Sequence, residues 1–173
     1  SSGTSAAQAT AAASSSQNQS KYEANVASVA GKMDNRVIAA YQQLGFKIVV
    51  DPSVNYSGYF DARSRSITMK QIDDSVYHEL GHFLAFIAGN ADKTASFQSI
   101  FAAEKANVTA FNKAYVTQNA SEYFAESVKD YILNNASLKS SRPQTYAAVQ
   151  NALNQITDAQ IAKIQKIYGA FWN

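Results

Sequence analysis

Two histidines and a glutamate, His78, Glu79 and His82, form the pattern His-Glu-x-x-His, and the chain has no other histidine. On a helix, residues four apart share a face, so both imidazoles can reach one metal ion. Glu79 is offset from His78 by about a third of a turn, which directs its carboxylate to a water on that metal. The pattern therefore predicts a zinc hydrolase with Glu79 as its base. The alternative is a histidine pair that only hydrates a helix surface.

A helix over about residues 74–88 is expected independently of this pattern. Asp73 or Asp74 can cap its first turn and complement the helix dipole, and Gly89-Asn90 is typical of a left-handed helix end. Apolar side chains that would face a core recur at helical spacing, at Val76, Leu80, Phe83, Leu84 and Ile87. This helix would carry both histidines.

Two imidazoles need a third protein ligand to complete a zinc site. The chain has no cysteine and no further histidine, which leaves Asp or Glu. Glu122 and Glu126 lie four residues apart on a predicted helix that is capped by Asn119 or Ser121 and ends near Asn134. We expect one glutamate to bind the metal and the other to orient a ligand histidine. The alternative is a capping box, in which Glu122 only stabilises the helix start.

The two glutamates belong to a longer pattern. His78-Glu79-x-x-His82, followed forty residues later by Glu122-Tyr123-Phe124-Ala125-Glu126, resembles the catalytic domain of anthrax lethal factor. The pattern resembles the clostridial Pro-Pro endopeptidases more closely. The segment 140–146 resembles these endopeptidases as well. The resemblance is densest over 77–152 and implies a zincin fold, a bound zinc ion and a secreted protease. It also implies that Glu122 is the third zinc ligand and that Glu126 orients a ligand histidine.

The resemblance implies further parts of the site. Tyr115, seven residues before Glu122, would donate a hydrogen bond to the oxyanion of the tetrahedral intermediate. The alternative is a core tyrosine with a satisfied hydroxyl. In zincin proteases generally, the substrate adds as a strand to the sheet edge before the motif helix, which here is Gly58-Tyr59-Phe60. The glycine-rich substrate loops of the Pro-Pro endopeptidases have no counterpart over 51–70, so a Pro-Pro preference is not predicted.

The remaining patterns predict helices and a small sheet. Residues 21–44 have helical spacing, which Gly31 weakens or splits, and 46–50 is typical of a strand. A hairpin is expected with arms 56–60 and 66–70. Further helices are expected over about 94–107, over 142–155 and from 157 or 158 onward. The segment 108–118 has no clear pattern. With the resemblance, we expect an α+β, predominantly α, zincin-like metalloprotease domain with a small β-sheet beside the His-Glu-x-x-His helix.

Composition sets the broad class. The chain has 173 residues, 46% hydrophobic and 16% charged, which indicates one globular domain. A net charge of +2 without a basic run argues against nucleic acid, and no apolar segment reaches the length of a membrane span. Residues 1–20 hold only small or uncharged polar side chains, typical of a tether, which leaves 21–173 as the catalytic domain. Such tethers commonly follow an export or lipid-anchor signal, so we expect secretion or tethering to the cell surface.

The leading hypothesis is a secreted zinc endopeptidase with one Zn²⁺ per chain. It would act as a monomer on protein or peptide substrates outside the cell. One alternative is a zinc amidase that acts on cell-wall peptides. Another is a non-catalytic helical binding module with a structural metal. Structural zinc sites usually have four protein ligands, and Glu79 would have no task in one, which disfavours the binding module.

Overall fold

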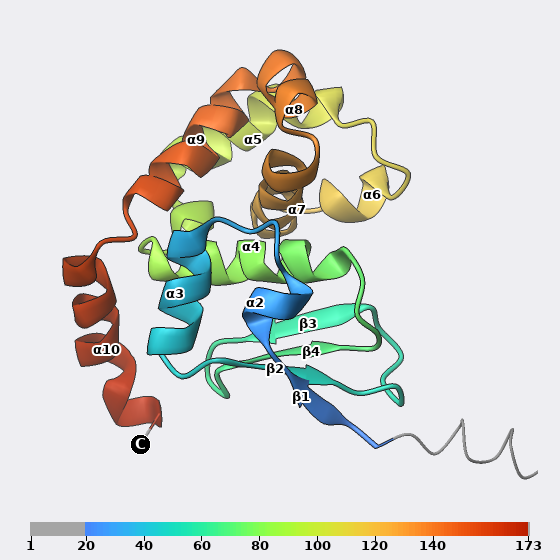
Figure 1. Ribbon diagram of the computed structural model, residues 1–173. Coiled ribbons are helices and arrows are strands. Elements are labelled where there is room, and N and C mark those ends of the chain that lie inside the picture. The colour runs from blue at the N-terminus through green and yellow to red at the C-terminus, as the bar shows by residue number, and fades with distance from the viewer. Residues whose placement is uncertain (1–19, 173) are drawn as a thin grey trace, which may run out of the picture.

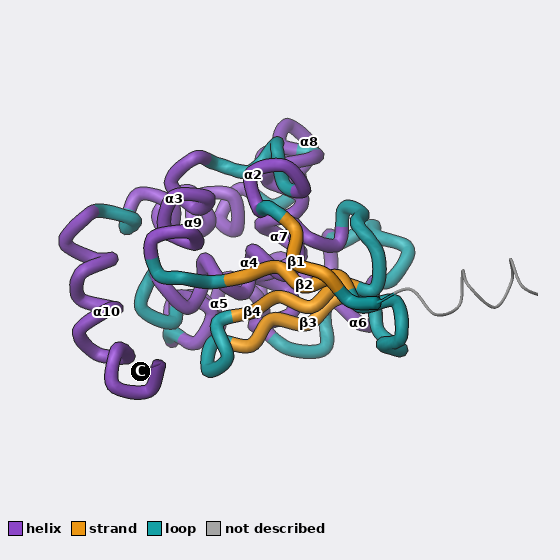
Figure 2. Tube along the Cα trace, turned by 60° about the horizontal axis from the view of Figure 1, so that its bottom comes forward, coloured by secondary structure: helices purple, strands orange, loops and turns teal. Residues whose placement is uncertain are grey.

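The computed structural model of the chain describes residues 20–172, in which four strands form one mixed sheet. Their order is β1-β2-β4-β3, with β2 parallel to β4 and the other pairs antiparallel. The strands are β1 (Tyr22–Ala24), β2 (Lys47–Val50), β3 (Gly58–Asp61) and β4 (Ser66–Met69). Figure 2 shows β3 at one edge of the sheet. The tether predicted over 1–20 lies, apart from Ser20, outside the described residues.

The sheet buries one face because its central strands alternate. Ile48 and Val50 of β2 and Ile67 and Met69 of β4 are buried, while the residues between them are more exposed. This period of two directs one set of side chains toward the helices. The strand predicted over 46–50 and the predicted hairpin are confirmed, with the first hairpin arm beginning at Gly58 rather than at residue 56.

The helix α4 (Ser75–Ile87) lies between the sheet and α7 (Ala120–Leu133), as Figure 1 shows. It confirms the helix predicted over 74–88, and Gly89 and Asn90 end it with positive φ values of 74° and 59°. Asp73, rather than Asp74, accepts hydrogen bonds from Ser75 at its start. Most side chains of α4 are buried because the sheet packs on one side of this helix and α7 packs on the other.

The contact between α4 and α7 depends on Gly81. A Cβ atom on Gly81 would lie 2.6 Å from the carbonyl oxygen of Ala125 and 2.7 Å from its Cα atom. Real Cβ atoms do not approach backbone this closely, so the two helix backbones meet only because position 81 has no side chain. This contact sets the distance between the residues that α4 and α7 carry.

The other helices lie around α7, beside α4 and at one end of the sheet (Figure 1). Predicted starts at Asn119 and Thr157 are confirmed by their side-chain hydrogen bonds, and Pro143 occupies the first turn of α9. The remaining elements are α2 (Val26–Val29), α3 (Asn35–Gln43), η1 (Ala91–Lys93), α5 (Ala95–Glu104), η2 (Lys105–Asn107), α6 (Lys113–Val116), α8 (Asn135–Ser141), α9 (Pro143–Asn154) and α10 (Asp158–Trp172). Helix α8 and the short helix α6 were not predicted.

The helix predicted over 21–44 is wrong at its start. Residues Tyr22–Ala24 instead form β1, which pairs antiparallel with β2. The side chain of Asn25 then accepts backbone N–H groups and begins α2, and the side chain of Asp34 begins α3 in the same way. These polar caps interrupt a continuous helix, while the apolar positions from Val26 onward still reach the core and Tyr22 is exposed.

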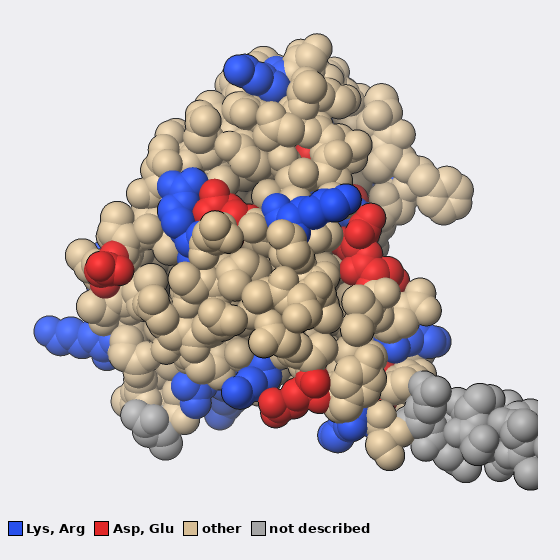
Figure 3. Space-filling view, in the orientation of Figure 1, with Lys and Arg blue, Asp and Glu red and all other residues tan. Residues whose placement is uncertain are grey.

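The observed architecture is α+β with helices predominating, as expected. In the part of the chain that the structure describes, no helix is long and apolar enough to span a membrane. On the face drawn in Figure 3, acidic side chains gather where α4 begins, and neither sign of charge forms a continuous patch. Negative charge at a helix start is favourable because it complements the helix dipole.

Candidate active site

The helix α4 presents His78 and Glu79 of the histidine-glutamate pattern to a pocket, while His82 lies one turn further along the helix and does not line it. His78 and Glu79 are buried and His82 is partly buried, and the centroids of the imidazole rings lie 5.0 Å apart. This separation is expected for side chains one helical turn apart. The pocket has a volume of about 430 Å³ and is lined by Tyr56, Ser57, Gly58, Ser75, His78, Glu79, Asn112, Tyr115, Glu126 and Lys129.

The helix α7 presents Glu122 and Glu126 to these histidines. Glu122 Oε2 lies 3.0 Å from His78 Nε2, and Glu122 Oε1 lies 3.3 Å from His82 Nε2. Glu126 Oε2 lies 2.7 Å from His78 Nδ1, so the histidine beside Glu126 is His78. Asn119 caps α7 by accepting the backbone N–H of Glu122 at 2.8 Å, while the carboxylate of Glu122 is directed at the imidazoles.

The nitrogens His78 Nε2 and His82 Nε2 and the carboxylate of Glu122 form a donor set that fits zinc. Zinc bonds of about 2.1 Å at a tetrahedral centre place neighbouring ligand atoms about 3.4 Å apart. The separations of 3.0 Å and 3.3 Å are close to this value. Glu79 lies close to the same two histidines, because one ligand atom each of His78, Glu79 and His82 lie within 4.8 Å of one another. Three protein ligands would leave a fourth position open, as in catalytic zinc sites.

Burial and hydrogen bonding act in opposite directions on the pKa of His78. Burial alone would lower its pKa, but hydrogen bonds to Glu122 and Glu126 outweigh burial and raise the pKa to about 9. Burial would likewise raise the pKa of Glu122, but hydrogen bonds from His78 and His82 hold it well below its ordinary value. The metal-free cluster therefore consists of a protonated imidazole between two carboxylates. A zinc ion would replace the shared proton on the Nε2 side.

Glu79 occupies a different environment. Burial raises the pKa of its carboxyl group, and the neighbouring charges of His78 and His82 oppose this effect. Its Cγ atom packs so closely on β3 that a Cβ atom on Gly58 would lie 2.8 Å away. Gly58 therefore leaves room for the Glu79 side chain. A carboxylate with a raised pKa is suited to accept and return a proton near neutral pH.

Tyr115 lies on the short helix α6, with its ring centroid 6.5 Å from that of His78. It is 54% exposed, which distinguishes it from a core tyrosine. Partial burial and the nearby charge of Glu122 raise the pKa of its phenol. The hydroxyl therefore stays protonated and able to donate a hydrogen bond beside the pocket.

The edge strand β3 brings Gly58 to the wall of the pocket. Phe60, two residues on and therefore on the same face, has its ring centroid 6.5 Å from that of His82, with the rings nearly parallel. Tyr59 points to the opposite face and is 58% exposed. Because β3 pairs only with β4 among the described strands, its other side is open to an added strand.

Sequence reasoning missed several residues of the pocket. Ser75 precedes His78 by three positions, and Lys129 follows Glu126 by three, so helical spacing places each beside a predicted site residue. That spacing could have identified both. Tyr56, Ser57 and Asn112 lie in loops whose path no local pattern predicts.

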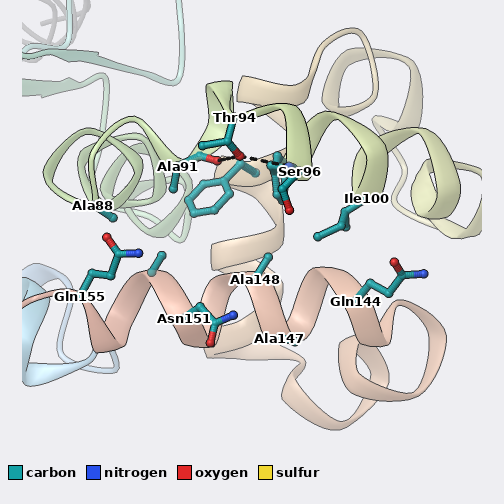
Figure 4. A pocket seen from close by; sticks show the side chains of 13 residues that line it. Ala88, Ala91, Thr94, Ser96, Ile100, Gln144, Ala147, Ala148, Asn151 and Gln155 are labelled. Carbon is teal, nitrogen blue, oxygen red and sulfur yellow. Dashed lines mark hydrogen bonds between the residues drawn. The ribbon is translucent and has the colours of Figure 1, made fainter.

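A separate pocket of about 420 Å³ lies between α5 and α9 (Figure 4). Gln144 and Asn151 of α9 and Gln155 just after it contribute amide side chains to the pocket, and alanines cover much of its wall. The described residues that line it include no titratable side chain. The pocket therefore offers no acid, base or metal ligand, in contrast to the pocket beside His78.

The stability of the metal-free protein should depend on pH through the histidine-carboxylate cluster. Because the folded pKa of His78 is about 9 against an ordinary 6.5, its contribution is complete below pH 6.5 and is lost as the pH rises through about 9. The lowered pKa of Glu122 acts oppositely, so its contribution is present above pH 4.5 and is lost at lower pH.

We therefore expect the free energy of unfolding in urea to be larger at about pH 6 than at about pH 9 for the metal-free chain. The zinc-loaded protein is the control, because metal ligation keeps the imidazoles neutral and should remove this decline. Equal stability of the metal-free chain at both pH values would contradict the prediction.

Comparison with known proteins gives two matches. The sequence profile of the family described as "Anthrax toxin lethal factor, N- and C-terminal domain" matches residues 61–152, more than half of the chain. The protein named "Pro-Pro endopeptidase" from Clostridioides difficile (strain 630) is 41% identical over 78 residues. That alignment covers 43% of this chain and 34% of the relative, so the chain matches about a third of the relative's length.

Proposed function

Because the chain belongs to the anthrax toxin lethal factor family, we propose that it is a zinc-dependent endopeptidase that is secreted or tethered to the cell surface. The observation that carries the proposal is the convergence of His78, His82 and Glu122 on one point, with the buried Glu79 beside them. The relative's printed name, an endopeptidase, supports the same reaction class. We propose residues 21–173 as the catalytic domain, acting as a monomer on extracellular protein or peptide substrates.

In this proposal His78, His82 and Glu122 hold one Zn²⁺, and Glu126 orients His78 through its Nδ1 atom. When bound, the zinc supplies Lewis acidity toward a water and toward the scissile carbonyl group. Glu79 accepts a proton from the attacking water and delivers it to the leaving amine. The phenol of Tyr115 donates a hydrogen bond to the oxyanion that develops on the carbonyl oxygen.

The substrate is proposed to bind beside β3. An extended peptide can pair with the open side of Gly58-Tyr59-Phe60, because main-chain N–H and C=O groups there have no neighbouring strand among the described residues. Strand addition would align the peptide with the pocket that contains His78 and Glu79. It selects for extended backbone rather than for a particular side chain.

Incubating a mixed synthetic peptide library with the zinc-loaded protein tests the function. Mass spectrometry should detect internal cuts that disappear when zinc is removed with 1,10-phenanthroline and return when zinc is restored. Cuts at Pro-Pro bonds alone would extend the relative's named preference to this chain. Release of peptides from purified cell walls, with the library left intact, would instead favour a zinc amidase.

Replacing Glu126 by glutamine should weaken zinc binding. The carboxylate that holds His78 Nδ1 at 2.7 Å is lost, although the side chain keeps its size. Loss of such a partner typically lowers metal affinity or activity about 10- to 100-fold. Competition with a fluorescent zinc chelator measures the affinity. Asp158→Asn on α10 is the control, and an unchanged zinc affinity in Glu126→Gln would contradict the role of Glu126.

A further inference from the structure

The pocket beside His78 continues into a second hollow. This second hollow has a volume of about 460 Å³ and lies between the segment 107–112 and helices α7 and α8. Asn112, Glu126 and Lys129 line both hollows, so the two adjoin at these residues. A peptide bound at His78 that extends in this direction must pass Lys129.

Most charged groups around this junction are paired. Asp130 and the buried Arg142 form an ion pair at 2.6 Å, and Glu126 contacts His78 at 2.7 Å. Lys129 is paired more loosely, through an ion pair with Glu126 one helical turn away. Its Nζ atom lies 3.8 Å from Glu126 Oε1, which is within ion-pair range but too long for a hydrogen bond, so this pair leaves the hydrogen-bond donors of the ammonium group free. Its side chain is 29% exposed.

An ammonium group has three donors and no acceptor, so Lys129 offers unused hydrogen-bond donors at the wall of the cleft. The match for a partly exposed ammonium is a carboxylate, because charge-assisted hydrogen bonds are stronger than neutral ones. An extended peptide advances about 3.3 Å per residue, so a residue near the scissile bond reaches the junction.

We propose that Lys129 determines substrate specificity by binding an Asp or Glu side chain close to the scissile bond. This inference rests on the proposed endopeptidase function and names a preference of the same site. It assigns Lys129 a contact with substrate and no part in the reaction itself. The preferred acidic residue would lie on the side of the scissile bond whose peptide segment passes the junction.

The test uses a peptide that the library identifies as cleaved. Matched peptides carry Glu, Gln or Lys at each position within three residues of the cut, and kcat/KM is measured for the wild type, Lys129→Met and Lys129→Glu. At one position the wild type should prefer Glu over Gln by about tenfold, as expected for a hydrogen bond between charged groups. Lys129→Met should lose this preference, and Lys129→Glu should prefer Lys.

Lys166→Met is the matched control, because Lys166 is exposed on α10 and lines neither hollow. Circular dichroism and zinc affinity verify that each variant is folded and loaded. A wild type that cuts peptides without a charge preference at any position overturns this inference and leaves the proposed function intact. An equal loss for all peptides in Lys129→Met, together with weaker zinc binding, also overturns it, since Lys129 would then act only by positioning Glu126. A wild type that cuts no peptide overturns both proposals.

Discussion

Replacing Glu79 by glutamine should lower kcat/KM for a cleaved peptide by about a thousandfold, the range expected for loss of a general base. The amide is nearly the same size as the carboxylate but cannot accept a proton from the attacking water. We expect the loss to lie mostly in kcat, because the substrate binds along β3 rather than to Glu79.

The same variant should keep its zinc and its fold. Among the described residues, His78 forms hydrogen bonds with Glu122 and Glu126, and His82 Nε2 lies 3.3 Å from Glu122; neither histidine is hydrogen-bonded to Glu79. Burial raises the pKa of Glu79, so a neutral amide at this position relieves an unfavourable buried charge. We therefore expect equal or slightly higher stability in urea, and zinc affinity within about threefold of wild type.

Glu23→Gln provides the control, because Glu23 is an exposed residue on β1 and should leave both quantities unchanged. A Glu79→Gln protein that binds zinc and retains full peptidase activity would exclude Glu79 as the base. Loss of zinc together with activity would instead indicate that Glu79 belongs to the metal ligands.

Local patterns account for the parts of the site that were predicted from sequence. The spacing of His78 and His82 and that of Glu122 and Glu126 each depend only on the geometry of one helix. Helix ends at Gly89, Asn119 and Pro143 follow from side-chain and backbone preferences that act within one turn. These features were therefore predictable without knowledge of the fold.

Contacts between distant segments account for what was missed. The strand β1 has three residues with no strong strand signal of its own, and its pairing with β2 holds it in place. The resemblance implied that β3 lies at the sheet edge, but no local pattern specifies the parallel pairing of β2 with β4 that leaves it there. Helical spacing places Lys129 beside Glu126, but the second hollow that Lys129 lines exists only because the distant segment 107–112 forms its opposite wall.

Gly81→Ala tests whether the contact between α4 and α7 builds the site. The new Cβ atom would lie 2.6 Å from Ala125 O, a backbone atom that cannot move aside without moving α7. Overpacking of this kind lowers the free energy of unfolding by about 1–3 kcal/mol or more, whereas the higher helix propensity of alanine raises it by about 1 kcal/mol. We expect the free energy of unfolding in urea to fall by about 2 kcal/mol for the metal-free chain.

The displacement of α7 should also weaken zinc binding, because α7 carries Glu122 and Glu126 while α4 carries the histidines. A shift of about 1 Å is large against the few tenths of an ångström that zinc ligation tolerates. Gly169→Ala in α10 is the matched control: its Cβ atom would meet only the flexible end of Gln165, at 3.2 Å. That variant should be as stable as wild type or more stable, with unchanged zinc affinity. If Gly81→Ala behaved in the same way, the close approach of α4 and α7 would not be what brings Glu122 within reach of the histidines.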